Sequence, residues 1–200
     1  MTFQTRWAAG ITALAAASVK SRLLSRFTTP ECLLDETTSD EEVRRALDAP
    51  GAGFVTLTKD GRLRGCIGNV TAIRPLYKTV VHHARQAMTD PRMAPVTIDE
   101  WPHLAIEVSV LSQPEAMDAV GRAEVTAALR PGIDGLILRQ GDRRATFLPS
   151  VWKTLTTPDR FVAALLAKGG WDDWPSDMTA ARYGTESFTD HPPRPHLEAP

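Results

Sequence analysis

The chain has 200 residues, of which 42% are hydrophobic and 24% are charged, and its formal net charge is −1. These values are typical of a soluble globular protein with room for a sizeable core. A net charge so close to zero offers no general attraction for nucleic acid or for a membrane surface. Cys32 and Cys66 are too few for a disulfide framework or a cysteine-rich zinc site, so we expect a reducing, cytoplasmic setting.

The N-terminal part predicts helices. Polar residues recur at helical spacing in an alanine-rich stretch, which favours an amphipathic helix over about 4–24 rather than a signal peptide. No apolar run reaches the roughly 18 residues of a transmembrane helix, so no membrane span is expected. Residues 28–38 are predicted to be irregular. Ser39 and Glu42 then form a capping-box pattern, which predicts a short helix ending near Leu47.

The next stretch predicts a β-hairpin. Residues 54–58 are rich in β-branched and aromatic residues, 59–62 contain an Asp-Gly turn, and 63–67 return as the second strand. Gly65 and Gly68 frame Cys66 in the return strand. Because glycine weakens a strand, two of them here indicate a place where another group approaches the backbone closely.

A helix and a strand follow the hairpin. Pro75 suits the first turn of a helix whose apolar residues recur at helical spacing as far as Ala87. A capping-box pattern of Thr97 and Glu100 predicts one helical turn. Residues 104–112 then alternate between apolar side chains and a second set that includes Glu107, which predicts a half-buried strand.

The C-terminal part repeats the mixture of hairpin and helix. We expect partial helix over 116–130, a second hairpin over 135–147, a helix over 159–168 and a strand within 182–188. Four prolines within 191–200 predict a disordered tail. Hairpins mixed with helices, without regular βαβ alternation, favour the α+β class with a mixed sheet flanked by helices.

Several short motifs resemble one family in both residues and order. They are Leu63-Arg64-Gly65-Cys66-Ile67-Gly68, Pro75-Leu76, Asp90-Pro91-Arg92, Ile106-Glu107-Val108-Ser109-Val110-Leu111, Pro131-Gly132-Ile133-Asp134-Gly135 and Thr146-Phe147-Leu148-Pro149-Ser150-Val151-Trp152. Together they resemble the AMMECR-one domain family over roughly residues 50–170. The resemblance implies one α+β domain over 1–190, with a larger and a smaller lobe around a cleft.

Cys66 is the first candidate for chemistry. Two readings are open: a nucleophile, redox thiol or soft metal ligand, or a small buried apolar residue. In a regular strand Arg64 would share a face with Cys66, and a nearby cation favours the thiolate.

Asp90, Arg92 and Glu107 complete the candidate set. A buried Glu107 would need a partner, and Arg64 and Arg92 are the natural ones. One reading makes Cys66, Arg64 and Glu107 catalytic, with Asp90 and Arg92 binding substrate in a cleft. The other reading is a structural network of ion pairs that joins the hairpin to the central strand.

The remaining patterns argue against an intrinsic metal or cofactor site. His82 and His83 diverge by about 100° on a helix, so both rings cannot easily reach one ion. The sequence has no phosphate-binding loop, dinucleotide-binding fingerprint or zinc-protease motif. It also lacks the spaced cysteines that ligate the iron–sulfur cluster of a radical SAM enzyme.

Three functions therefore stay open. Prokaryotic proteins of similar sequence are called AmmeMemoRadiSam system protein A, which implies a Memo-like protein and a radical SAM enzyme as partners. The radical SAM enzyme would carry the iron–sulfur cluster and S-adenosylmethionine. The alternatives are a stand-alone enzyme that uses Cys66 on a small molecule, and a regulatory module that binds protein or nucleic acid. The neutral net charge makes nucleic acid the weaker choice.

Overall fold

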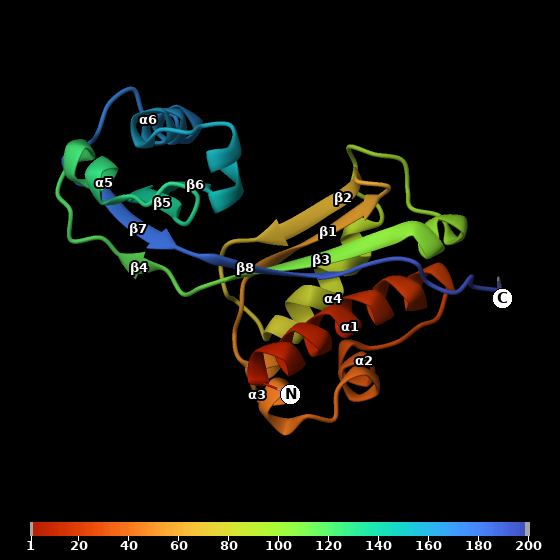
Figure 1. The fold of residues 1–200 in the computed structure, drawn as a ribbon. Coiled ribbons are helices and arrows are strands. Elements are labelled where there is room, and N and C mark those ends of the chain that lie inside the picture. Colours follow the sequence, from red (N-terminus) through yellow and green to blue (C-terminus); the bar gives the residue numbers. More distant parts are fainter. Residues whose placement is uncertain (1, 199–200) are drawn as a thin grey trace. The chain divides into compact units, whose positions relative to one another are not determined.

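The computed structural model describes residues 2–198, and the chain divides into two compact units (Figure 1). Unit 1 holds residues 2–110 and 187–198 of the described part, and the smaller unit 2 holds 111–186. Each unit contains one four-stranded sheet and its own helices. The α+β class is therefore confirmed, and the strand pairings β1–β2, β1–β3, β5–β6, β5–β7 and β4–β7 are antiparallel.

Unit 1 is built from four helices, a 3₁₀ turn and a sheet with the order β2-β1-β3-β8. In chain order its elements are α1 (Phe3–Leu23), α2 (Pro30–Thr37), α3 (Glu41–Asp48), β1 (Gly53–Lys59), β2 (Arg62–Asn69), α4 (Leu76–Ala87), the 3₁₀ helix η1 (Ile98–His103), β3 (Leu104–Leu111) and β8 (Thr185–Asp190). The predicted first helix, first hairpin, helix from Pro75 to Ala87 and central strand all form, as α1, β1–β2, α4 and β3. Within residues 2–198, no helix has both the length and the apolar content to cross a membrane.

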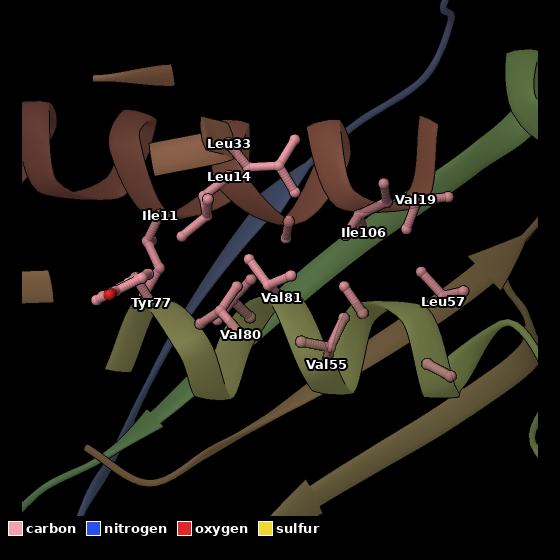
Figure 2. Close-up of a cluster of buried hydrophobic side chains, with 14 of the residues drawn as sticks. Ile11, Leu14, Val19, Leu33, Val55, Leu57, Tyr77, Val80, Val81 and Ile106 are labelled. Carbon is pink, nitrogen blue, oxygen red and sulfur yellow. The ribbon is translucent and has the colours of Figure 1, made fainter. Parts of the chain in front are cut away.

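The core of unit 1 lies between the helices and one face of this sheet. Figure 2 shows side chains from α1, α2 and α4 meeting side chains from β1 and β3. Val55, Leu57, Ile106 and Val108 point into this core and are almost completely buried. The alternating partners of these residues therefore point to the opposite face of the sheet, which we call the outer face. Its central side chains are those of Phe54, Thr56, Cys66, Glu107 and Ser109.

Three local predictions are wrong. Residues 30–37 are helical rather than irregular, because Pro30 starts a helix and the Thr29 side chain accepts a hydrogen bond from the Cys32 N–H. The cap of α3 is Asp40 instead of Ser39. The single strand expected within 182–188 is two strands, β7 and β8, which belong to different sheets.

Residues 191–198 contain no helix or strand, but one side chain attaches this segment to unit 1. Arg194 forms an ion pair of 2.7 Å with Asp190, donates to the backbone carbonyl of Leu104 and lies over the Trp101 ring. Disorder over 191–200 stays a prediction, and residues 199–200 lie outside the described residues.

Unit 2 packs helices onto a sheet with the order β4-β7-β5-β6. Its elements are β4 (Glu115–Ala116), α5 (Arg122–Ala128), β5 (Gly135–Gln140), β6 (Arg143–Phe147), η2 (Pro149–Lys153), α6 (Pro158–Gly169) and β7 (Thr179–Tyr183). The rings of Trp152 and Phe161 stack with centroids 4.0 Å apart in its core. Asp134 is completely buried, binds the Arg130 guanidinium at 2.7 Å, and its carbonyl accepts from the Trp152 indole. The motif over 131–135 and the motif over 146–152 are thus joined by a hydrogen bond within this unit.

Close packing explains why residue 65 is a glycine. A Cβ atom added there would lie 1.8 Å from the Ala87 carbonyl oxygen at the end of α4, so strand β2 and helix α4 touch through their backbones. A Cβ at Gly68 would meet the Phe54 ring at 2.2 Å. Both glycines of the signature therefore provide close packing, as the sequence predicts.

Gly65→Ala is expected to destabilise the protein by about 3 kcal/mol, because the clash is with backbone and only a movement of α4 relieves it. Urea-induced unfolding of the full chain measures this loss of stability. The control is Gly61→Asn in the same hairpin, where the position is open and asparagine tolerates the positive φ of 74°. A cost at Gly65 no larger than the cost at Gly61 would contradict the packing.

Candidate functional site

The candidate residues lie on or beside strand β2, at the edge of the first sheet. An edge strand leaves alternate backbone N–H and C=O groups without a neighbouring strand. At Cys66 those groups are taken by two side chains. The Asp90 carboxylate accepts from the Cys66 N–H at 3.0 Å, and the Arg92 guanidinium donates to the Cys66 carbonyl at 3.0 Å. We call this arrangement the edge clamp.

The edge clamp is held together by its own ion pair. The Asp90 side chain is fully buried and also accepts from the backbone N–H and the Nε of Arg92, at 3.1 and 2.9 Å. The hydrogen bond from the Arg92 side chain, followed by that from the Cys66 N–H, holds the pKa of Asp90 well below its usual range. Both carboxylate oxygens of Asp90 are thus occupied by hydrogen bonds from Arg92 and Cys66, and these bonds have a structural role.

Arg64 does not join this group. The pairing of β1 with β2 shifts at this point: Leu57 faces Gly65 and Thr58 faces Leu63, which leaves Arg64 without an opposed residue. The Arg64 guanidinium instead makes a bidentate pair with Glu100 of η1, at 2.7 and 2.9 Å. The expectation that Arg64 acts beside Cys66 assumes a regular strand, and this bulge removes that basis.

Glu107 also has a different partner from the predicted ones. Neither Arg64 nor Arg92 is its hydrogen-bond partner, because those guanidinium groups are bound to Glu100 and Asp90. The Glu107 carboxylate accepts from the Ser109 hydroxyl at 3.2 Å, and Ser109 in turn lies 2.8 Å from the Ser187 hydroxyl. Glu107 therefore sits half-buried in a polar row on the outer face.

Cys66 and Glu107 share the outer face, with Thr56 between them. Thr56 lies opposite Cys66 on one side and opposite Glu107 on the other, and its hydroxyl donates to the Cys66 sulfur at 3.3 Å. Directly opposed residues on neighbouring strands have Cβ atoms about 5 Å apart, so the Cβ atoms of Cys66 and Glu107 are about 10 Å apart. The Cys66 sulfur accepts from Thr56 and the Glu107 carboxylate accepts from Ser109, so each side chain has a hydrogen-bond partner other than the other.

The two adjacent histidines, His82 and His83, both lie on α4. His83 is buried, and its Nε2 lies 3.3 Å from the Asn69 side-chain oxygen. Burial, with smaller contributions from His82 and Arg74, lowers the pKa of His83 to about 4, so the ring is neutral at pH 7. No group of three or more potential ligands within residues 2–198 is placed to hold a metal ion.

Comparisons with known proteins agree with the motifs. The AMMECR1 family profile matches residues 13–188. The chain belongs to the AMMECR1 family. A protein of Methanosarcina barkeri is 33% identical over 138 residues, which cover 68% of each chain. A protein of Methanothermobacter thermautotrophicus is 42% identical over 99 residues, which cover 49% of this chain and 52% of that protein.

One solved structure in the comparison is the uncharacterized protein PH0010 from Pyrococcus horikoshii. Its TM-score is 0.74 at 27% identity, and the match covers 94% of both chains. The aligned part of the chain spans about half the length of several curated relatives, for example 44% of a Saccharolobus islandicus protein that is 41% identical. Family and fold are thus shown.

The ion pair of Arg64 and Glu100 predicts a dependence of stability on pH. The hydrogen bonds from Arg64, together with the Thr97 N–H, lower the pKa of Glu100 to about 2, although burial opposes this. A carboxyl whose pKa is lowered on folding stabilises the protein fully above its ordinary value of 4.5, and this contribution disappears as the pH falls toward 2.

Glu100→Gln should therefore lower Tm by about 5 °C at pH 7, with the difference from wild type shrinking between pH 4.5 and pH 2. Thermal unfolding across this range measures it. The control is Glu36→Gln on an exposed part of α2. A difference that stays constant with pH would show that the Glu100 charge is unimportant.

Proposed function

We propose that this protein is the component of an AmmeMemoRadiSam-type system that binds the Memo-like protein, and that the outer face of the first sheet makes the contact. Membership of the AMMECR1 family supports the system, because related prokaryotic proteins take their name from it. In this proposal the radical SAM enzyme carries the iron–sulfur cluster and S-adenosylmethionine, and this chain contributes no redox cofactor.

The observation that carries the proposal is that three of the five candidate residues, Asp90, Arg92 and Arg64, are bound to structural partners. Asp90 and Arg92 bind the edge of β2, and Arg64 binds Glu100, so these charges hold the signature hairpin in place. The groups left on the outer face are the Phe54 ring, one thiol, several hydroxyls and the Glu107 carboxylate, all half-buried or exposed. A rigid strand surface that combines one aromatic ring with polar groups supports recognition of a partner more than it supports acid–base chemistry.

The alternative is a stand-alone enzyme with Cys66 as its nucleophile. It is favoured by the half-buried thiol beside the Thr56 hydroxyl. Against it, the Glu107 carboxylate is bound by the Ser109 hydroxyl, and Asp90 and Arg92 bind the backbone of Cys66, so these three groups are engaged elsewhere than at the thiol. Alkylation of Cys66 by iodoacetamide faster than that of the exposed Cys32 would favour this alternative over the proposal.

The proposal predicts that this protein and the Memo-like protein of the same source co-elute in size-exclusion chromatography at micromolar concentration. Glu107→Lys reverses the one charge of the polar row and should weaken the complex at least about tenfold. Cys66→Ser, which preserves size, reports whether the thiol contributes. Circular dichroism of each variant verifies that it is folded.

The matched control is Glu36→Lys, which makes the same charge change on exposed α2 and should leave the affinity unchanged. Equal weakening by the two charge reversals would place the contact elsewhere. No complex with the wild-type chain would contradict the proposed partnership and leave the thiol enzyme as the better account.

A further inference from the structure

A second, separate feature of unit 1 is a cavity of about 300 Å³ beside the ends of α1 and α4. Its lining includes Arg22, Arg26, Arg85, His82 and the fully exposed ring of Phe27, and the rest of the lining is uncharged and polar. We call it the arginine pocket. It involves none of the residues of the outer face or of the edge clamp.

The backbone builds this pocket by a sharp reversal after α1. Ser25 adopts a left-handed conformation with a φ of 52°, and the Arg26 N–H returns to the Ser21 carbonyl at 2.8 Å. The Arg85 guanidinium of α4 donates to the Thr28 carbonyl at 2.6 Å. Two chain segments far apart in sequence therefore bring their cations to one fixed place.

The charges in the pocket are unbalanced. The lining contains no carboxylate, and the ion pairs found within residues 2–198 do not involve Arg22, Arg26 or Arg85. Burial, followed by the charge of Arg22, lowers the pKa of Arg85, so the two guanidinium groups repel each other. The negative ends of α1 and α4 account for one cation each. These are Arg22 and Arg85, which lie in the last turns of the two helices, whereas Arg26 lies beyond the end of α1 and is not accounted for in this way.

Phe27 is the second unusual group. Its side chain is at least as exposed as in an extended peptide, with a relative exposure of 107%, although phenylalanine is usually buried. It lines the same pocket as the three arginines. An aromatic face beside guanidinium groups matches a ligand that has a planar ring and a phosphate, because rings stack on aromatic side chains and guanidinium binds phosphate bidentately.

We propose that the arginine pocket binds a small phosphorylated ligand with a planar ring, of the nucleoside monophosphate class. Arg26 and Arg85 bind the phosphate, and Phe27 stacks on the ring. The volume lies at the lower end of the range for small-molecule sites, so the pocket suits one nucleotide. This proposal does not depend on the partnership proposed above.

Calorimetric titration of the full chain tests the proposal with three probes: AMP, ribose 5-phosphate and adenosine. AMP should bind most tightly, ribose 5-phosphate more weakly, and adenosine, which lacks the phosphate, weakest of all. Arg26→Gln should weaken AMP at least about tenfold. Phe27→Ala should weaken AMP but leave ribose 5-phosphate unchanged.

The matched control is Arg160→Gln on the exposed surface of α6, which removes the same charge far from this pocket in sequence. AMP affinity should not change in this variant. Three results would overturn the proposal: no AMP binding at millimolar concentration, equal weakening by the Arg26 and Arg160 variants, or binding of a short single-stranded RNA far tighter than AMP. The last result would identify the pocket as part of a nucleic-acid surface.

Discussion

The hydrogen bond from the Cys66 N–H, at the edge of β2, to the buried Asp90 carboxylate determines how the signature hairpin is held. A sheet edge exposes backbone groups that would otherwise pair with another strand. Here a carboxylate takes the N–H and a guanidinium takes the C=O of a single residue, Cys66. The thiol is therefore fixed through its own backbone, and its side chain points to the outer face beside Thr56. The position of Cys66 is a consequence of the Asp-Pro-Arg motif.

The same interaction explains why the motifs of the family lie where they do. Gly65 allows β2 to touch the end of α4, and the chain leaving α4 carries Asp90 and Arg92 back to β2. Arg64 fastens the other end of the strand to Glu100 in η1. In unit 2, Asp134 and Trp152 join two further motifs in a comparable way. Most signature residues are thus needed for structure, and the surface they hold in place is where we propose the partner binds.

Periodicity predicted much of this fold. The alternation of residues 104–112, the Asp-Gly turn and the apolar face of α4 each follow from local spacing, and each element forms. The α2 helix could have been predicted, since Thr29-Pro30 is a typical helix start. The edge clamp could not have been predicted, because sheet order decides which strand lies at an edge, and residues 66 and 90 are far apart in sequence.

The candidate site shows the limit of strand periodicity most clearly. A regular strand places Arg64 and Cys66 on one face, whereas a single register shift against β1 removes Arg64 from the row and directs it to Glu100. Such a shift depends on tertiary pairing. The arginine pocket was also missed, because its cations come from residues 22–26 and 82–85, which no single motif joins.

The edge clamp is tested most directly by amide hydrogen exchange at Cys66 in the native protein. The Cys66 N–H faces away from β1, so strand pairing does not protect it, and only the bond to Asp90 can. We predict protection comparable to that of Ile67, whose N–H faces β1, and selective loss of the Cys66 protection in Asp90→Ala. Exchange of the wild-type Cys66 amide at the rate of an unstructured peptide would contradict the clamp and the account built on it.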